Sequence, residues 1–170
     1  WPQPPASPGA PAEAGLRIER VAQPVVHQLG YASEGGALRR LYLLSTDIAP
    51  EVMGYGGPIE LLVVVDVETA AFERIEVLRW SETPSYVQAS GAFLDQFRGW
   101  SLVKPLDAER IDAMTGATIS SHAVTEIVER CRVVAASLLA LPSGARADAA
   151  PPSDPAAPFL LALSFVALAA

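Results

Sequence analysis

The chain has 170 residues, of which 51% are hydrophobic and 18% are charged, and its formal net charge is −7. This is long and apolar enough for one globular domain with a hydrophobic core. The negative charge argues against a nucleic-acid partner, because such partners are bound by surplus positive charge.

Proline use divides the chain. Ten of the fifteen prolines lie outside residues 16–141. We therefore expect a flexible proline-rich arm over residues 1–15, a single folded domain over 16–141 and a proline- and alanine-rich linker over 142–158.

The final residues 159–170 carry no charge but are too few to span a bilayer, which takes roughly 20 residues. After such a linker we expect the start of a truncated transmembrane helix, with a segment packed on the domain as the alternative. The linker lacks the Lys/Arg excess of a cytoplasmic flank, which favours the outer face of the membrane.

Within the core, hydrophobic runs predict strands over residues 37–44, 59–66 and 73–80. The short link before the third run makes it an antiparallel neighbour of the second. His27, ahead of these runs, falls in a stretch with no regular pattern. Strands followed by a long helix predict an α+β domain with an antiparallel sheet.

Two helices are expected after the strands. The first can be opened by Pro84, and its apolar residues lie over residues 86–97. The second begins with Ser120 or Ser121 as N-cap, ends before Pro142, and places Cys131 on its apolar stripe as a small buried residue. Its charged residues, Arg132 among them, lie mostly off that stripe.

Residues 112–121 precede this helix with a carboxylate, several hydroxyls and the small pair Gly116-Ala117. Amide donors and the positive end of a helix dipole favour an anion at such a place. The stretch therefore predicts a phosphate site, and a simple helix cap is the alternative.

Three further segments occur upstream in a fixed order. They are Gly54-Tyr55-Gly56-Gly57-Pro58-Ile59, then Glu82-Thr83-Pro84, then a Phe-x-x-Gln-Phe-x-Gly pattern over residues 93–99. Together with Thr115-Gly116-Ala117-Thr118, they resemble the FMN-binding domain of the Rnf and Na⁺-translocating quinone reductase subunits and of NosR-type membrane flavoproteins. The resemblance covers about residues 37–139. It departs from the family at residues 85–87, where Gly-Leu-Gly is common, and at Ala113, where Gly is common.

The resemblance implies that FMN is joined to Thr118 through a phosphoester bond. The implied phosphate contacts are Thr115, Gly116, Ala117 and Ser120, and the implied flavin-ring contacts are Tyr55, Gly56, Gly57, Glu82 and Thr83. Asp112 would position a metal during attachment or accept hydrogen bonds from the turn. An external flavin transferase that uses FAD and Mg²⁺ is expected to activate the Thr118 oxygen.

The expected protein is thus an extracytoplasmic FMN-carrying domain of a membrane-bound electron-transfer protein. Its partners would be membrane redox proteins, including iron–sulfur modules of the same full-length protein. The sequence shows no set of catalytic residues, so we expect no autonomous enzyme activity. The alternative is a sensory or scaffolding ectodomain of a membrane regulator that binds flavin reversibly or not at all.

Overall fold

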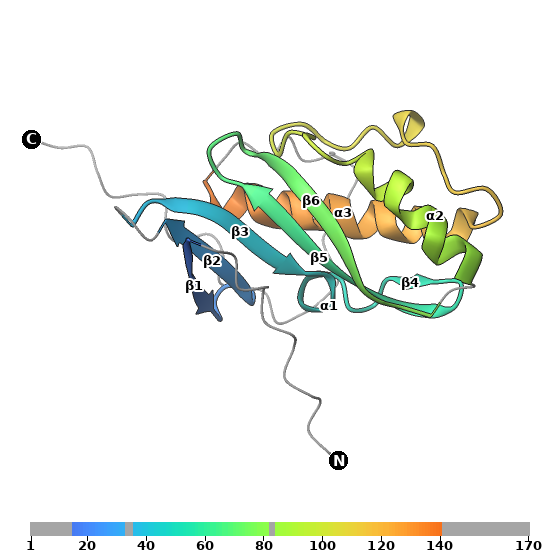
Figure 1. Cartoon of the computed structure of the whole chain (residues 1–170), viewed down its shortest axis with the longest axis horizontal. Helices are drawn as coiled ribbons and strands as arrows, with labels where there is room; N and C mark the ends of the chain where they lie inside the picture. Colours follow the sequence, from blue (N-terminus) through green and yellow to red (C-terminus); the bar gives the residue numbers. More distant parts are fainter. Residues whose placement is uncertain (1–14, 33–35, 82–83, 141–170) are drawn as a thin grey trace, which may run out of the picture.

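The computed structural model describes residues 15–32, 36–81 and 84–140. In this part of the chain, one six-stranded sheet is covered on one face by the long last helix (Figure 1). The strands are β1 (Leu16–Val21), β2 (His27–Ala32), β3 (Leu38–Leu44), β4 (Met53–Gly54), β5 (Gly57–Asp66) and β6 (Ala71–Trp80). The helices are α1 (Ser45–Ile48), α2 (Pro84–Asp95), α3 (Thr118–Leu138) and a 3₁₀ turn, η1 (Ala108–Arg110).

Strand β5 is the centre of the sheet. It pairs antiparallel with β3 and with β6 over most of its length, and the short β4 joins its first two residues. Strands β1 and β2 continue the sheet beyond β3. The predicted α+β class with an antiparallel sheet is confirmed, and so are the three predicted strands, within two residues at each end.

The uninterrupted apolar run of β5 follows from burial on both faces of the sheet. Leu61, Val63 and Val65 belong to the main core with α3, whereas Leu62 and Val64 join Tyr42 in a smaller cluster. Alternate side chains of a strand point to opposite faces of the sheet. Because both faces are covered here, every residue from Leu61 to Val65 is buried and apolar.

Helix α3 supplies one complete side of the main core. Its buried apolar residues follow the spacing expected of an amphipathic helix, and they are Ala123, Val124, Ile127, Val128, Cys131, Ala135 and Ala136. Cys131 is buried as predicted. Arg132, expected mostly off the stripe, is fully buried as well.

The burial of Arg132 has a local cause. Its guanidinium makes two hydrogen bonds to the Glu129 carboxylate, each 2.8 Å long, and donates to Leu102 O at 2.5 Å. Glu129 also accepts a hydrogen bond from Leu106 N. This ion pair ties the loop after α2 to α3, and the buried charge of Arg132 is paired with a carboxylate.

The sequence did not reveal β1 and β2. His27 was expected in an irregular stretch, yet it is the buried first residue of β2, and its Nδ1 lies 2.7 Å from Val25 O. Strand β1 is at the edge of the sheet and stays half exposed, so it carries only a weak hydrophobic pattern.

Helix α2 begins at Pro84, the residue expected to open it, and ends at Asp95, two residues before the end of the predicted stretch. Proline is favoured in a first helical turn because its missing N–H has no partner there. Phe93 and Phe97 are buried and meet edge to face, with ring centroids 5.6 Å apart. This contact fixes the end of α2 against the core.

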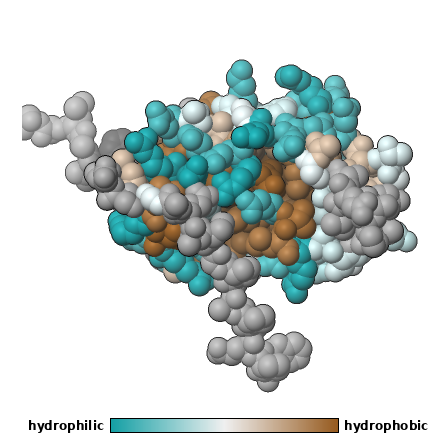
Figure 2. Space-filling model, viewed as in Figure 1, coloured by the Kyte–Doolittle hydropathy of each residue, from teal (hydrophilic) through white to brown (hydrophobic). Residues whose placement is uncertain are grey.

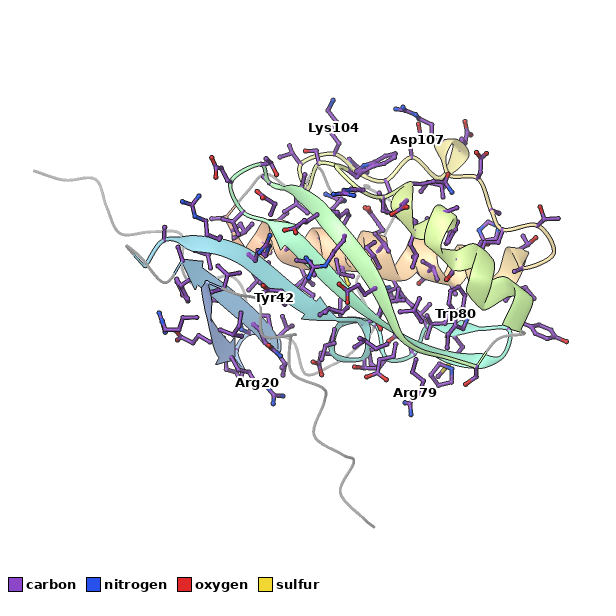
Figure 3. All side chains as sticks on the ribbon, in the orientation of Figure 1. Arg20, Tyr42, Arg79, Trp80, Lys104 and Asp107 are labelled. Atoms are coloured by element: carbon purple, nitrogen blue, oxygen red, sulfur yellow. The ribbon has the colours of Figure 1, made fainter. Side chains whose placement is uncertain are left out.

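The visible face of the molecule carries polar residues around an apolar area in its middle (Figure 2). Arg20, Arg79, Lys104 and Asp107 point outward from the fold (Figure 3). No helix in the described part of the chain is both long and apolar enough to cross a membrane. The predicted linker and the predicted start of a transmembrane helix lie outside the described residues.

Candidate functional site

Residues 112–118 form a turn that leads into α3, and we call it the motif turn. Gly116 has φ of +80°, a conformation that glycine adopts without strain. Ala117 N donates to Met114 O at 3.0 Å, which closes the turn. Helical hydrogen bonding then starts at once, because Ser121 N donates to Ala117 O.

Helix α3 therefore has Ala117 as N-cap and Thr118 as its first residue. The prediction that Ser120 or Ser121 caps the helix is wrong. The chain reverses direction at Gly116, so the helix begins at Thr118, two residues before Ser120. Both serines lie in the first turn of α3 and are buried.

Each buried serine hydroxyl joins α3 to another part of the site. The Ser120 hydroxyl accepts a hydrogen bond from Tyr55 N at 3.1 Å. The Ser121 hydroxyl accepts from Met114 N and donates to Ala117 O, both at 2.9 Å. The first turn of α3 is thus hydrogen-bonded to Tyr55 and to the motif turn.

The opening of α3 can receive an anion. Its N-cap, Ala117, has no side chain that can cap the helix, and the positive end of a 21-residue helix dipole lies here. Thr115, Gly116 and Thr118 are exposed beside it. Oxygen anions fit such a place because N–H groups and dipole both favour them.

Residues 54–57, which we call the glycine hairpin, form a tight turn between β4 and β5. Gly54 pairs with Gly57, which leaves Tyr55 and Gly56 as the two loop residues, and Gly57 has φ of +118°. The Tyr55 side chain is 80% exposed, although its backbone amide is bonded to Ser120. The hairpin therefore presents backbone and an aromatic ring to solvent next to the first turn of α3.

An ion pair holds the segment before this hairpin. Arg130 on α3 donates to Glu51 and to Glu126. Its hydrogen bond lowers the pKa of the Glu51 carboxyl and raises the pKa of the Arg130 guanidinium. Because Glu51 lies two residues ahead of β4, this contact helps to keep the hairpin beside α3.

Gln96, just after α2, holds the start of the motif turn. Its carboxamide nitrogen donates to Asp112 O at 3.0 Å, and its carboxamide oxygen accepts from Asp112 N at 2.8 Å. Asp112 itself is exposed. The glutamine of the Phe-x-x-Gln-Phe-x-Gly pattern is thereby connected to the motif turn.

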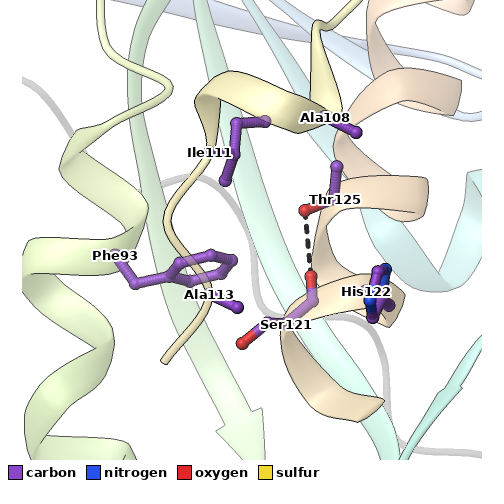
Figure 4. Close-up of a pocket in the computed structure, with 7 residues that line it drawn as sticks. All are labelled: Phe93, Ala108, Ile111, Ala113, Ser121, His122 and Thr125. Atoms are coloured by element: carbon purple, nitrogen blue, oxygen red, sulfur yellow. Dashed lines mark hydrogen bonds between the residues drawn. The ribbon is translucent and has the colours of Figure 1, made fainter. Parts of the chain in front are cut away.

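A small pocket lies between α2, η1 and α3 (Figure 4). Its volume is about 40 Å³, and it is lined by Phe93, Ala108, Ile111, Ala113, Ser121, His122 and Thr125. Cofactor pockets usually enclose about 300–1,000 Å³. A flavin ring does not fit inside this pocket.

The structure thus brings together most of the predicted site residues. Thr115, Gly116, Ala117 and Thr118 share the motif turn, and the Tyr55 segment adjoins it through Ser120. Glu82 and Thr83 lie outside the described residues. Sequence reasoning missed Gln96 and Ser121 as parts of the site; the signal for Gln96 was its place in the 93–99 pattern.

The described residues contain no group of three or more His, Cys, Asp or Glu side chains placed to hold a metal ion. Cys131 lies in the core, where burial raises the pKa of its thiol to about 12. A thiol so protected stays protonated and unreactive at neutral pH. What the site offers chemically is exposed hydroxyls beside a helix start.

Comparison with known proteins agrees with this geometry. The profile of the FMN-binding domain family matches residues 54–132, from the glycine hairpin through the motif turn to the buried arginine of α3. That segment belongs to the FMN-binding domain family.

A relative of this FMN-binding domain is one of the subunits of the proton-translocating ferredoxin:NAD⁺ oxidoreductase complex of Clostridium ljungdahlii. The two sequences are 36% identical over 109 residues, which is 58% of this chain and 55% of the relative. The chain is a distant homologue of that Rnf complex protein, and the alignment spans about half of the relative's length.

Proposed function

We propose that this FMN-binding domain carries its FMN covalently, through a phosphoester bond to the Oγ atom of Thr118. One observation carries the choice of residue. Of the three hydroxyls in the first turn of α3, those of Ser120 and Ser121 are buried and hydrogen-bonded, whereas Thr118 is exposed. Thr118 is therefore the residue of this turn that a modifying enzyme can reach.

The attachment is a group transfer from FAD. The Thr118 oxygen attacks the phosphorus on the riboflavin side of FAD, and a new O–P bond forms. The P–O–P bond breaks, AMP leaves, and the threonine proton passes to a base of the flavin transferase. A free threonine hydroxyl is a weak nucleophile, so this base and Mg²⁺ supply the activation.

The chain's own residues hold the product. The amides at the start of α3, with Thr115, Gly116 and Ala117, bind the phosphate, and Ser120 contributes its backbone amide because its hydroxyl is buried. Tyr55, Gly56 and Gly57 support the flavin ring, together with Glu82 and Thr83. The exposed carboxylate of Asp112 stands at the start of the motif turn, where a hard oxygen ligand can position Mg²⁺ during transfer.

FMN supplies one- and two-electron transfer when it is bound. The domain then serves as an electron carrier of a membrane-bound redox complex, on the extracytoplasmic side, anchored through residues 159–170. Its partners are a flavin transferase for maturation and redox proteins, including iron–sulfur modules of the same full-length protein. The relationship to a protein of an Rnf complex supports this role.

The test is the mass of the 170-residue chain after co-expression with a flavin transferase. We expect one covalent FMN on the peptide containing Thr118, full FMN incorporation in Thr69→Ala, an exposed threonine in the turn between β5 and β6, and none in Thr118→Ala. The Thr118→Ala chain should fold normally, because surface substitutions usually change stability by about 0.5 kcal/mol or less. An unmodified wild-type chain would refute the proposal, and flavin that acid precipitation releases would support reversible binding instead.

A further inference from the structure

Asp112 opens the motif turn in a stretch without regular structure. A single side chain nevertheless pairs both of its backbone polar groups: Gln96 donates to its carbonyl oxygen and accepts from its amide. Only one orientation of the carboxamide satisfies both hydrogen bonds. The plane of the Asp112 backbone is therefore set from outside the motif turn.

The other end of the motif turn is held by Ser121, which bonds Met114 N and Ala117 O. The turn is thus fixed on one side by α3 and on the other by the end of α2. These two anchors differ in burial. Ser121 is 2% exposed, whereas Gln96 is half-buried and its hydrogen bonds to Asp112 lie at the surface.

We infer that Gln96 is a positioning residue for flavin attachment, an inference that rests on the proposed function. It touches no reacting atom. It holds the Asp112 backbone, and with it the motif turn, in the arrangement that a flavin transferase binds. The Ser121 anchor is buried, whereas Gln96 is half-buried with its hydrogen bonds at the surface, so we expect that the Gln96 anchor can be removed without unfolding the domain.

A positioning role has a kinetic signature. Without the Gln96 hydrogen bonds the motif turn samples other conformations, and only a fraction of molecules presents Thr118 correctly. The apparent dissociation constant then rises by the reciprocal of that fraction, while the bound complex reacts as before. For two hydrogen bonds we expect KM for the protein substrate to rise roughly tenfold, with kcat changed less than about twofold.

The experiment compares the wild-type chain with Gln96→Leu, Gln96→Glu and Arg98→Gln. Initial rates of flavin attachment are measured with a flavin transferase, FAD and Mg²⁺ over a range of protein concentrations. Arg98→Gln is the matched control at an exposed position of the same turn, and it should behave as wild type. Gln96→Glu still accepts from Asp112 N but cannot donate to Asp112 O, so its KM should fall between wild type and Gln96→Leu.

A second measurement needs no flavin. Hydrogen exchange in the unmodified chain should show the Asp112 amide protected in wild type and in Arg98→Gln, and exposed to exchange in Gln96→Leu. The thermal midpoint should stay close to wild type in all variants. If Gln96→Leu is poorly folded, Gln96→Glu provides the same comparison.

The outcomes separate the two proposals. A modified wild type together with an unchanged KM in Gln96→Leu would overturn this inference alone. A fall in kcat at constant KM would also overturn it, because it would place Gln96 in the chemical step. A wild-type chain that is never modified would overturn both the inference and the proposed function.

Discussion

The two ends of α3 are held in different ways. From Val124 onward the helix is fixed by packing, with a continuous buried stripe and a fully buried arginine. Its first turn is fixed by the hydrogen bonds of Ser120 and Ser121, while Thr118 and Ile119 face solvent. From Val124 onward, packing supplies the stability. In the first turn, hydrogen bonds hold the backbone and leave the Thr118 hydroxyl exposed in a defined place.

The largest effect should come from the packed end. Arg132→Ala removes the hydrogen bonds to Glu129 and to Leu102 O and leaves both acceptors without the guanidinium. Breaking a buried ion pair from one side costs about 3 kcal/mol of unfolding free energy. Urea denaturation measures this loss. Arg130→Ala, which removes the more exposed ion pairs to Glu51 and Glu126, should cost far less; equal losses would contradict the comparison.

A smaller effect is expected at the first turn. Ser120→Ala removes the acceptor of the Tyr55 amide, and a single hydrogen bond contributes about 1 kcal/mol. We expect the thermal midpoint to fall slightly and the Tyr55 amide to exchange faster with solvent. If the Tyr55 amide stays protected, this bond does not hold the glycine hairpin against α3.

The smallest effect at neutral pH concerns Cys131. Burial raises the pKa of its thiol from 9.0 to about 12. In the unfolded chain the thiol keeps its ordinary pKa of 9.0. The stability that folding gains from keeping the thiol neutral is therefore fully present below pH 9. That contribution is lost as the pH rises from about 9 to 12.

Denaturation of wild type and Cys131→Ala at pH 7, 9 and 10 tests this. The alanine variant loses the same packing energy at every pH, so this loss does not affect the slope of the unfolding free energy against pH. Stability should fall more steeply above pH 9 in wild type than in the variant. Identical slopes would show that the thiol is less enclosed than the rest of the buried stripe.

Much of the fold could be predicted from the sequence because the central strands and α3 carry strong hydrophobic patterns. Strands β1 and β2 could not, since they are strands through pairing, β1 with β2 and β2 with β3, rather than through their own composition. The same holds for His27, whose burial depends on the hairpin around it. Arg132 was misplaced because a charged residue is buried only when specific partners surround it.

The candidate site divides in the same way. The residues of the motif turn were predictable, since their types indicate an anion site at a helix start. The start of α3 was not, because it depends on the conformation of Gly116. Nor were the partners of Gln96 and Ser121, because a hydrogen bond between distant segments leaves no periodic pattern in the sequence.

The bond between Ser120 and Tyr55 joins residues 65 positions apart. Closing so long a loop costs entropy that the bond alone cannot offset, so it forms only when the sheet and α3 have already come together. A short synthetic peptide with the sequence of residues 112–121 lacks Tyr55, Gln96 and the body of α3. The arrangement around Thr118 is therefore a property of the folded domain, and the ten-residue motif does not possess it in isolation.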